Sequence, residues 1–118
     1  MRYRRQETFR YILPHPRSIP FRLVWEEKEL HEGEGLLLNM SSRGLKLRSD
    51  YLFPLSGELK VHIVLDLVPS LQPLEVIGQV RHRSQMGNTY DYGIQLETTS
   101  DEIQQLVTMI KSYARDNK

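Results

Sequence analysis

Alternation of apolar and polar residues dominates this sequence, and it is clearest in GELKVHIVLDL (57–67). Leucine, valine and isoleucine occupy every second position there, whereas the positions between them are mostly charged or polar. Because successive side chains of a β-strand point to opposite faces, this pattern predicts a strand with one buried face. A chain that repeats this pattern several times is expected to fold around a sheet.

Five further segments show the same period of two. The residues expected to point inward are Phe21, Leu23 and Trp25; Leu36, Leu38 and Met40; Leu45 and Leu47; Leu74, Val76, Gly78 and Val80; and Tyr90, Tyr92, Ile94 and Leu96. Gly87-Asn88 between two such segments is typical of a hairpin turn. Strands this close in sequence are expected to pair antiparallel.

The period changes near the end of the chain. From Asp101 onward the apolar residues recur at helical spacing, and Thr99-x-x-Glu102 forms a capping box. About six strands and one helix predict a mainly β fold, a small antiparallel six-stranded (split) β-barrel with one C-terminal α-helix packed outside it or over one end. We expect one domain with a flexible basic arm (1–20), the barrel (21–98) and the helix (99–116).

Charge is distributed unevenly along the chain. The first 22 residues contain six arginines and one acid, whereas the following WEEKELHEGEG, expected as a loop, contains five glutamates and one lysine. A basic arm favours an anionic partner. The alternative is that the arginines only keep a small protein soluble.

Several classes of function lack their sequence signals. The chain contains no cysteine, no apolar run of about 20 residues and no secretory signal, so a soluble, cytoplasmic protein is expected. Its four histidines lack metal-ligand spacing, and neither a G-x-S-x-G elbow nor a phosphate-binding glycine pattern occurs. We therefore expect no enzyme activity, no metal and no cofactor.

The segment NMSSRG (39–44) interrupts two leucine-bearing strands with polar residues. In an extended chain Asn39 and Ser41 point in one direction, Ser42 and Arg43 form the turn, and Gly44 permits a positive φ or a close backbone approach. Such a polar shelf of amide, hydroxyl and backbone N–H groups suits a nucleobase edge or a phosphate. Alternatively, the side chains only satisfy their own turn.

In context, this segment resembles the (Asp/Asn)-x-Ser-x-x-Gly motif of the PilZ domain, a family that binds the bacterial second messenger cyclic di-GMP. The family pairs that motif with an earlier arginine motif, R-x-x-x-R, and here RYRRQETFRY stands at about the expected distance. GLKLRS, PLSG, GQVRHR, YGIQL and the terminal helix follow in family order, so the resemblance spans essentially the whole chain.

The resemblance implies a receptor or adaptor for cyclic di-GMP that relays the signal to a protein partner, with motility or biofilm regulation as family outputs. The implied ligand-binding residues are Arg4, Arg5, Arg10, Asn39, Ser41 and Gly44, with Arg43 and Arg81 in possible supporting roles. Arginine can grip phosphate bidentately and stack on a base. We expect the ligand to recruit the arm across the shelf.

One spacing departs from the family pattern, because four residues separate Arg5 from Arg10 where the motif has three. A degenerate PilZ-like interaction module that binds no nucleotide is therefore an alternative. A second alternative is a small-barrel binder of single-stranded nucleic acid, since aromatic residues alternate with the arginines of the arm. Neither a membrane nor nucleic acid is the expected partner.

Overall fold

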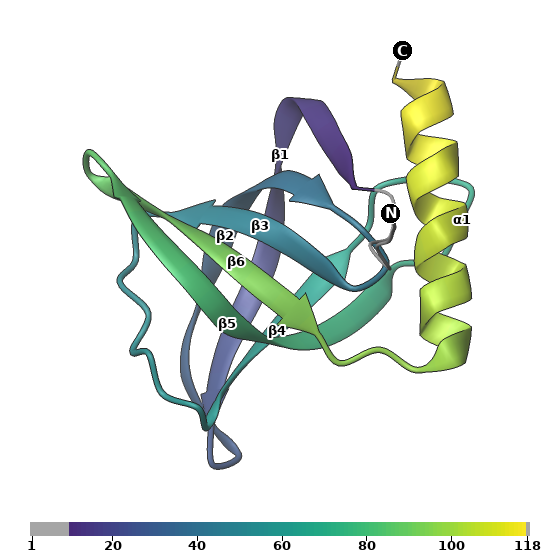
Figure 1. The fold of residues 1–118 in the computed structure, drawn as a ribbon. Helices are drawn as coiled ribbons and strands as arrows, with labels where there is room; N and C mark the ends of the chain where they lie inside the picture. Colours follow the sequence, from purple (N-terminus) through teal and green to yellow (C-terminus); the bar gives the residue numbers. More distant parts are fainter. Residues whose placement is uncertain (1–9, 118) are drawn as a thin grey trace, which may run out of the picture.

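The computed structural model describes residues 10–117 of the chain. They form β1 (Tyr11–Trp25), β2 (Lys28–Met40), β3 (Gly44–Ser49), β4 (Leu59–Leu65), β5 (Leu74–Met86), β6 (Thr89–Leu96) and α1 (Ser100–Asp116). The strands close an antiparallel barrel in the order β1-β2-β3-β6-β5-β4 (Figure 1). The predicted six-stranded antiparallel barrel with one C-terminal helix is confirmed.

The barrel interior contains the apolar residues that the period-two pattern selects. In β4 the side chains of Leu59, Val61, Ile63 and Leu65 are all buried. Removing this apolar surface from water is the main free-energy gain that holds the strands together. The positions between these four residues, which include Lys60 and His62, are only partly buried and lie on the outer face of the strand.

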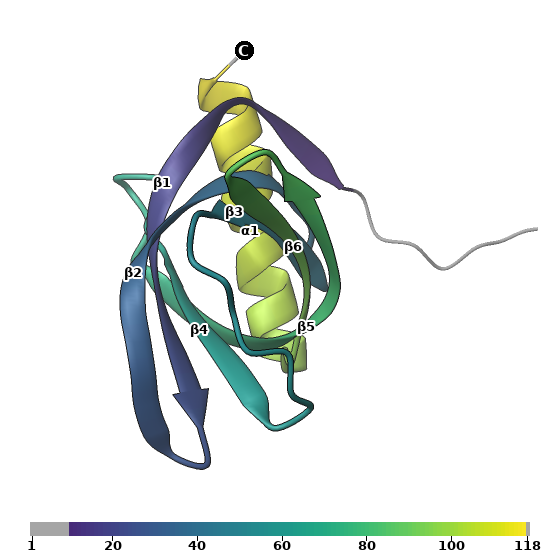
Figure 2. The same ribbon diagram turned by 90° about the vertical axis from the view of Figure 1, so that its left-hand side faces the viewer.

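Helix α1 lies across one end of the barrel, as the two views in Figures 1 and 2 show. Its apolar face buries Leu106, Met109, Ile110 and Tyr113. Tyr113 meets the ring of Tyr11 edge-on, with 6.0 Å between centroids. The predicted capping box at Thr99 is present. Of the two expected placements, the helix takes the one over the barrel end.

The buried hydroxyl of Tyr92 fastens the long loop between β3 and β4 to the barrel. It accepts a hydrogen bond from the Phe53 amide at 2.9 Å and donates one to the Tyr51 carbonyl at 2.8 Å. The rings of Phe53 and Tyr92 also stack, with centroids 3.9 Å apart. Burial raises the pKa of Tyr92, so this hydroxyl keeps its proton and stays a donor.

The sequence predicts an arm over residues 1–20, but β1 already begins at Tyr11. This part of the strand is not recognisable in the sequence because it contains three prolines, and proline has no N–H to donate to a sheet. Pro14 and Pro16 fall where the pairing of β1 with β2 is interrupted, between Ile12 and Arg17. The interrupted register therefore accommodates prolines that would break a regular ladder.

The acidic stretch expected as a loop is a hairpin. Its tip is Glu26-Glu27, where both residues have positive φ (52° and 68°), and β2 starts immediately afterwards at Lys28. Asparagine and glycine are the residues that favour such backbone angles, so two glutamates give no local signal for the turn.

One predicted face of β2 is wrong. Leu36 and Leu38 were expected inside with Met40, yet Leu36 is 38% exposed and Leu37 is fully buried. The pairing of β2 with β3 is irregular between Leu37 and Asn39, and the extra residue reverses the alternation there. The irregularity turns Asn39 outward, beside Lys46.

Within residues 10–117, no helix has the length and apolar character that crossing a membrane requires.

Candidate functional site

The loop between β2 and β3 is held by Ser41. Its Oγ accepts hydrogen bonds from the amides of Arg43 and Gly44, both at 3.2 Å, and donates to the Gly44 carbonyl at 3.3 Å. The Ser41 amide also donates to that carbonyl at 2.7 Å, and the residue is 2% exposed. The serine hydroxyl thus fixes the turn, and the two amides are already satisfied by it.

Gly44 lets two other groups come close to the loop. A Cβ at this position would lie 2.9 Å from the Ile94 carbonyl oxygen and 3.4 Å from Arg10 Nη2. The sequence suggests two reasons for a glycine at position 44, a positive φ or a close backbone approach. The positive φ is found at Gly87 and not at Gly44, so the close approach explains Gly44. The missing side chain makes room for a guanidinium group.

Arg10 occupies that room. It directly precedes β1, and its Nη1 donates a hydrogen bond of 2.5 Å to Asn39 Oδ1 on β2. Arg10, Asn39 and Gly44 are therefore brought together, although Arg10 lies 29 residues from Asn39 in sequence. Arg4 and Arg5 lie outside the described residues.

The two supporting arginines lie near the same surface. Arg43 is exposed on the loop, and Arg81 on β5 donates from Nε to Gln95 Oε1 at 2.7 Å. Gln95 on β6 is the cross-strand partner of Gly44. Arg81 is thereby linked to the strand next to the loop.

Sequence reasoning misses the strand neighbours of these residues. Lys46 is the partner of Asn39 on one side and of Gly93 on the other, and His82 is the partner of Gly93. The alternation in GLKLRS already places Lys46 on the face of Gly44. Which residues of β5 and β6 lie beside it depends on the register, which the sequence does not give.

Asp91, at the edge of this surface, forms an ion pair with Arg48. Arg48 donates from Nε to Asp91 Oδ1 at 2.7 Å and from Nη2 to Oδ2 at 3.1 Å. These hydrogen bonds hold the pKa of Asp91 below its usual value, although burial opposes them, and nearby Lys46 adds a smaller effect. With Asp91 paired, the face around Arg10, Lys46 and Arg81 favours an anion.

The paired Asp91 predicts a pH-dependent contribution to stability. Because its pKa is lowered in the folded state, the stabilisation is fully present above the pKa of the unfolded chain and is lost as the pH falls through the folded value. Asp91→Asn is expected to cost about 1–3 kcal/mol of unfolding free energy at pH 7 and progressively less below about pH 4. Urea unfolding at several pH values measures this, with exposed Asp66→Asn as control. A cost that does not shrink in acid would contradict the assignment.

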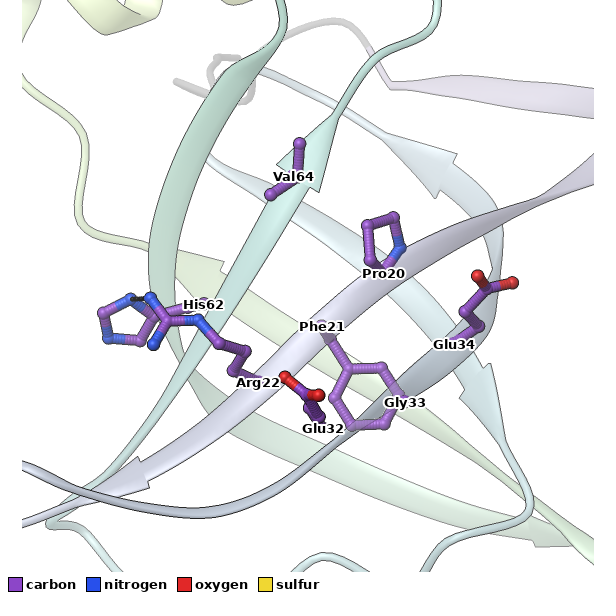
Figure 3. A pocket seen from close by; sticks show the side chains of 8 residues that line it. All are labelled: Pro20, Phe21, Arg22, Glu32, Gly33, Glu34, His62 and Val64. Carbon is purple, nitrogen blue, oxygen red and sulfur yellow. Dashed lines mark hydrogen bonds between the residues drawn. The ribbon is translucent and has the colours of Figure 1, made fainter.

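The opposite side of the barrel contains a hollow of a different character (Figure 3). It has a volume of about 420 Å³ and is lined by Pro20, Phe21, Arg22, Glu32, Gly33, Glu34, His62 and Val64. Two glutamates of β2 stand at its rim, and one of them, Glu34, accepts a hydrogen bond of 2.6 Å from Ser18. Their negative charge disfavours a phosphate-bearing ligand here.

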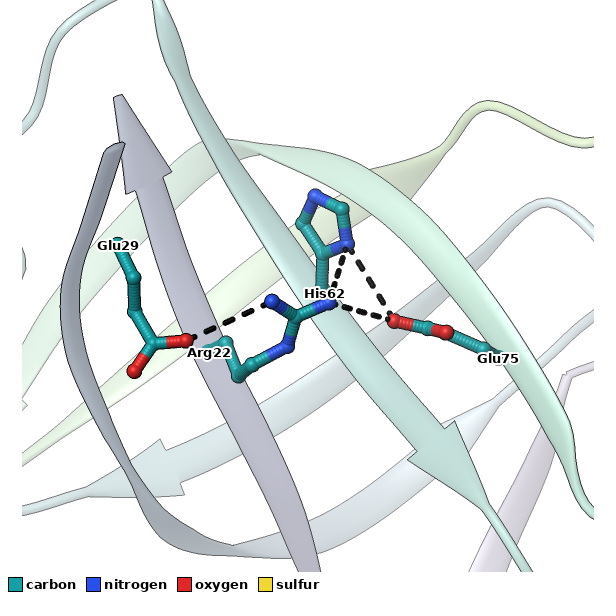
Figure 4. A network of polar contacts seen from close by, with 4 residues as sticks. All are labelled: Arg22, Glu29, His62 and Glu75. Carbon is teal, nitrogen blue, oxygen red and sulfur yellow. Dashed lines mark hydrogen bonds and ion pairs between the residues drawn. The ribbon is translucent and has the colours of Figure 1, made fainter. Parts of the chain in front are cut away.

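Arg22, the arginine that lines this hollow, forms ion pairs with neighbouring glutamates (Figure 4). Arg22 donates to Glu75 at 3.0 Å and to Glu29 at 3.5 Å, and it lies 3.3 Å from His62 Nδ1. The hydrogen bond from Arg22 lowers the pKa of Glu75, and that of Arg22 is raised in turn. His62, on the outer face of its strand, is partly buried by this network. The arginine is consequently committed to carboxylates.

The described part of the chain contains no cluster of side chains that could bind a metal ion. Among residues 10–117, no three histidine, aspartate or glutamate side chains gather where they would hold an ion. The features that remain are a basic outer face, an amide, and a loop shaped by a serine and a glycine.

The protein is thus a small closed β-barrel domain with an outer surface whose charge suits an anion. The family model described as the PilZ domain matches residues 3–112, and the chain belongs to this family. No curated protein matches the sequence.

Solved structures support the same fold. The PilZ domain of YcgR from Escherichia coli with c-di-GMP has a TM-score of 0.69 at 16% identity, covering 96% of this chain and 94% of that one. The PilZ domain of CeSA from a cellulose-synthesizing bacterium has a TM-score of 0.58 at 15% identity, with coverages of 91% and 99%.

A third similar structure is the Bacillus subtilis inhibitor of motility, MotI/DgrA. It has a TM-score of 0.68 at 18% identity. The match covers 98% of this chain but 54% of that one, so the chain spans about half the length of MotI/DgrA. At these identities the likeness shows the fold.

Proposed function

We propose that this protein is a non-catalytic cytoplasmic receptor for cyclic di-GMP and an adaptor that passes the signal to a protein partner. Family membership supports a cyclic di-GMP-binding or PilZ-type adaptor role. The observation that carries the proposal further is the contact of Arg10 with Asn39 above Gly44. Arg10, the described member of the arginine motif, thus lies beside the polar loop although it stands 29 residues from Asn39 in sequence.

In this proposal the guanidinium group of Arg10 binds a phosphate and the edge or face of a guanine. Only one of its nitrogens is used in the hydrogen bond to Asn39, so further N–H groups remain for a ligand. Asn39 Oδ1 has a second lone pair, which accepts from a guanine N–H. The contact with Asn39 also fixes the direction of the Arg10 fork before the ligand arrives.

The other predicted site residues take different roles. Ser41 is buried and committed to the turn, so we assign it the shaping of the loop and not a direct contact with phosphate. Gly44 provides the space for Arg10. Arg4 and Arg5 bind the second phosphate when the ligand recruits the arm, with Arg43 and Arg81 contributing positive charge.

Relay to a partner follows from the same recruitment. When the arm closes on the ligand, the surface around the β2–β3 loop changes in shape and charge, and a partner that recognises one form loses or gains its contacts. The outputs known for the family, motility or biofilm regulation, are the ones we propose to examine first.

Calorimetric titration with cyclic di-GMP tests the proposed ligand. The wild-type protein is expected to bind, and Asn39→Ala is expected to bind about tenfold more weakly, because Arg10 loses its anchor and guanine loses an acceptor. Exposed Gln72→Ala, near the start of β5, serves as control. Absence of binding by the wild-type protein would favour the degenerate interaction module.

Salt dependence separates the ligand from single-stranded nucleic acid. A dinucleotide carries two phosphates, so its affinity is expected to fall shallowly between 50 and 200 mM salt. A DNA oligonucleotide would release many counterions and lose affinity steeply. Tight, steeply salt-dependent binding of an oligonucleotide without binding of cyclic di-GMP would contradict the proposal.

A further inference from the structure

A row of residues crosses the outer face of the barrel from the Arg10 contact. Asn39 on β2 pairs with Lys46 on β3, Lys46 pairs with Gly93 on β6, and Gly93 pairs with His82 on β5. Cross-strand partners lie side by side and on one face of a sheet. With neighbouring strands about 4.8 Å apart, Gly93 lies about 10 Å and His82 about 14 Å from Asn39.

The residues of this row all face outward. Lys46 and Gly93 are half-buried and His82 is exposed, whereas their strand neighbours Leu47 and Ile94 are buried. A Cβ built on Gly93 would lie 3.4 Å from the Cβ of His82, so the two positions share a face. The irregular pairing between Val80 and His82 is what turns His82 to this side.

Gly93 leaves a gap in the row. Within 4 Å of its absent side chain the structure places only atoms of His82. The result is a strip of bare strand backbone with an ammonium group on one side and an imidazole on the other. A flat ring can lie on such a strip, and a histidine ring is one of the side chains on which nucleobases stack.

The charges around the strip favour an anionic, electron-rich ligand. Lys46 and Arg81 flank it, and the adjacent Asp91 is paired with Arg48. The carboxylates of Glu32 and Glu34 line the separate hollow beside β1 and β4. Phosphate and base can therefore be accommodated together on this face.

We infer that the second base of cyclic di-GMP lies on Gly93 between Lys46 and His82, while Arg10 and Asn39 hold the first. The inference rests on the proposed function, since it concerns the same ligand. The two bases of a cyclic dinucleotide are attached to different sugars of its ring, so the second base needs a contact point of its own. The row supplies a second point two to three strands away, with Lys46 between them for a phosphate.

Two substitutions test this placement by calorimetry with cyclic di-GMP. Gly93→Val fills the strip with a side chain that strands accommodate well, and His82→Ala removes the stacking ring. Each is expected to weaken binding about tenfold or more. His82→Phe keeps a ring without the imidazole nitrogens and is expected to retain affinity within about threefold. His62→Ala, the same change on the opposite face, is expected to bind like the wild type.

The outcomes separate the two proposals. If the wild-type protein binds no cyclic di-GMP, the proposed function fails and the inference fails with it. If the wild type binds and both His82→Ala and Gly93→Val bind within twofold of it, the inference is overturned while the function stands. Thermal unfolding checks that each variant is folded, and should Gly93→Val not fold, the comparison of His82→Ala with His82→Phe decides.

Discussion

Arg10→Ala is expected to lower the affinity for cyclic di-GMP about 100-fold. The Arg10 guanidinium group hydrogen-bonds to Asn39 and lies beside Gly44, at the two ends of the polar segment. The substitution leaves Asn39 without its partner, and under the proposed function it also deletes a charge-assisted, two-pronged contact with phosphate or guanine. Calorimetry with the purified protein measures the loss directly.

Two companion variants show which property of Arg10 matters. Arg10→Lys keeps the charge but not the planar fork, so an affinity between those of wild type and Arg10→Ala is expected. Arg22→Ala removes an equal charge from β1, the strand that Arg10 precedes, at a position where Glu75 and Glu29 hold the side chain. If Arg22→Ala weakens binding as strongly as Arg10→Ala, the affinity depends only on the net charge of the protein, and the proposed site at Arg10 is wrong.

Tyr92→Phe is expected to lower the free energy of unfolding by about 2–3 kcal/mol, with a melting temperature about 10 °C lower. The change removes one oxygen atom and no apolar surface. It leaves the buried amide of Phe53 without an acceptor and the carbonyl of Tyr51 without a donor. An unpaired buried amide bears the full cost of lost hydration.

Tyr90→Phe is the matched control for this effect. Tyr90 lies two residues earlier on the same strand and faces the same side, but its hydroxyl makes no hydrogen bond with the described residues. Its loss is expected to change the unfolding free energy by less than about 0.5 kcal/mol. Equal effects of the two substitutions in urea unfolding would show that the hydrogen bonds of Tyr92 do not anchor the loop.

The sequence correctly predicts the elements whose buried faces are marked by a regular spacing of apolar side chains. β4 and β6 alternate without interruption, and Tyr92, Ile94 and Leu96 are buried as expected. The predicted turn at Gly87-Asn88 joins β5 to β6. α1 combines an apolar stripe with a capping box, so both its face and its start are readable from local residues.

The first half of β2 is hidden from such reading because its inward positions lack apolar side chains. His31, Gly33 and Gly35 point into the barrel, and the ring of His31 stacks on Tyr51 at 3.7 Å. A Cβ on Gly35 would lie 2.8 Å from the Arg48 carbonyl oxygen, so this strand crosses its neighbour too closely for a larger residue. Glycine is needed at Gly35 because it has no side chain, and a search for alternating hydrophobic residues does not detect such a position.

The candidate site divides along the same line. Asn39, Ser41 and Gly44 stand within six residues, so the motif is visible in one short segment. The strip around Gly93 is not, because it depends on the pairing of three strands and on the irregular step before His82. Local motifs identify the loop, and register identifies what lies next to it.

The prolines of β1 have a consequence for how a partner can attach. Residues Phe21–Trp25 pair with both β2 and β4, whereas the preceding half of the strand pairs with β2 alone. That half carries Pro14, Pro16 and Pro20, none of which can donate a backbone hydrogen bond. An incoming chain is thus discouraged from extending the sheet at this margin, and association is steered toward recognition of side chains.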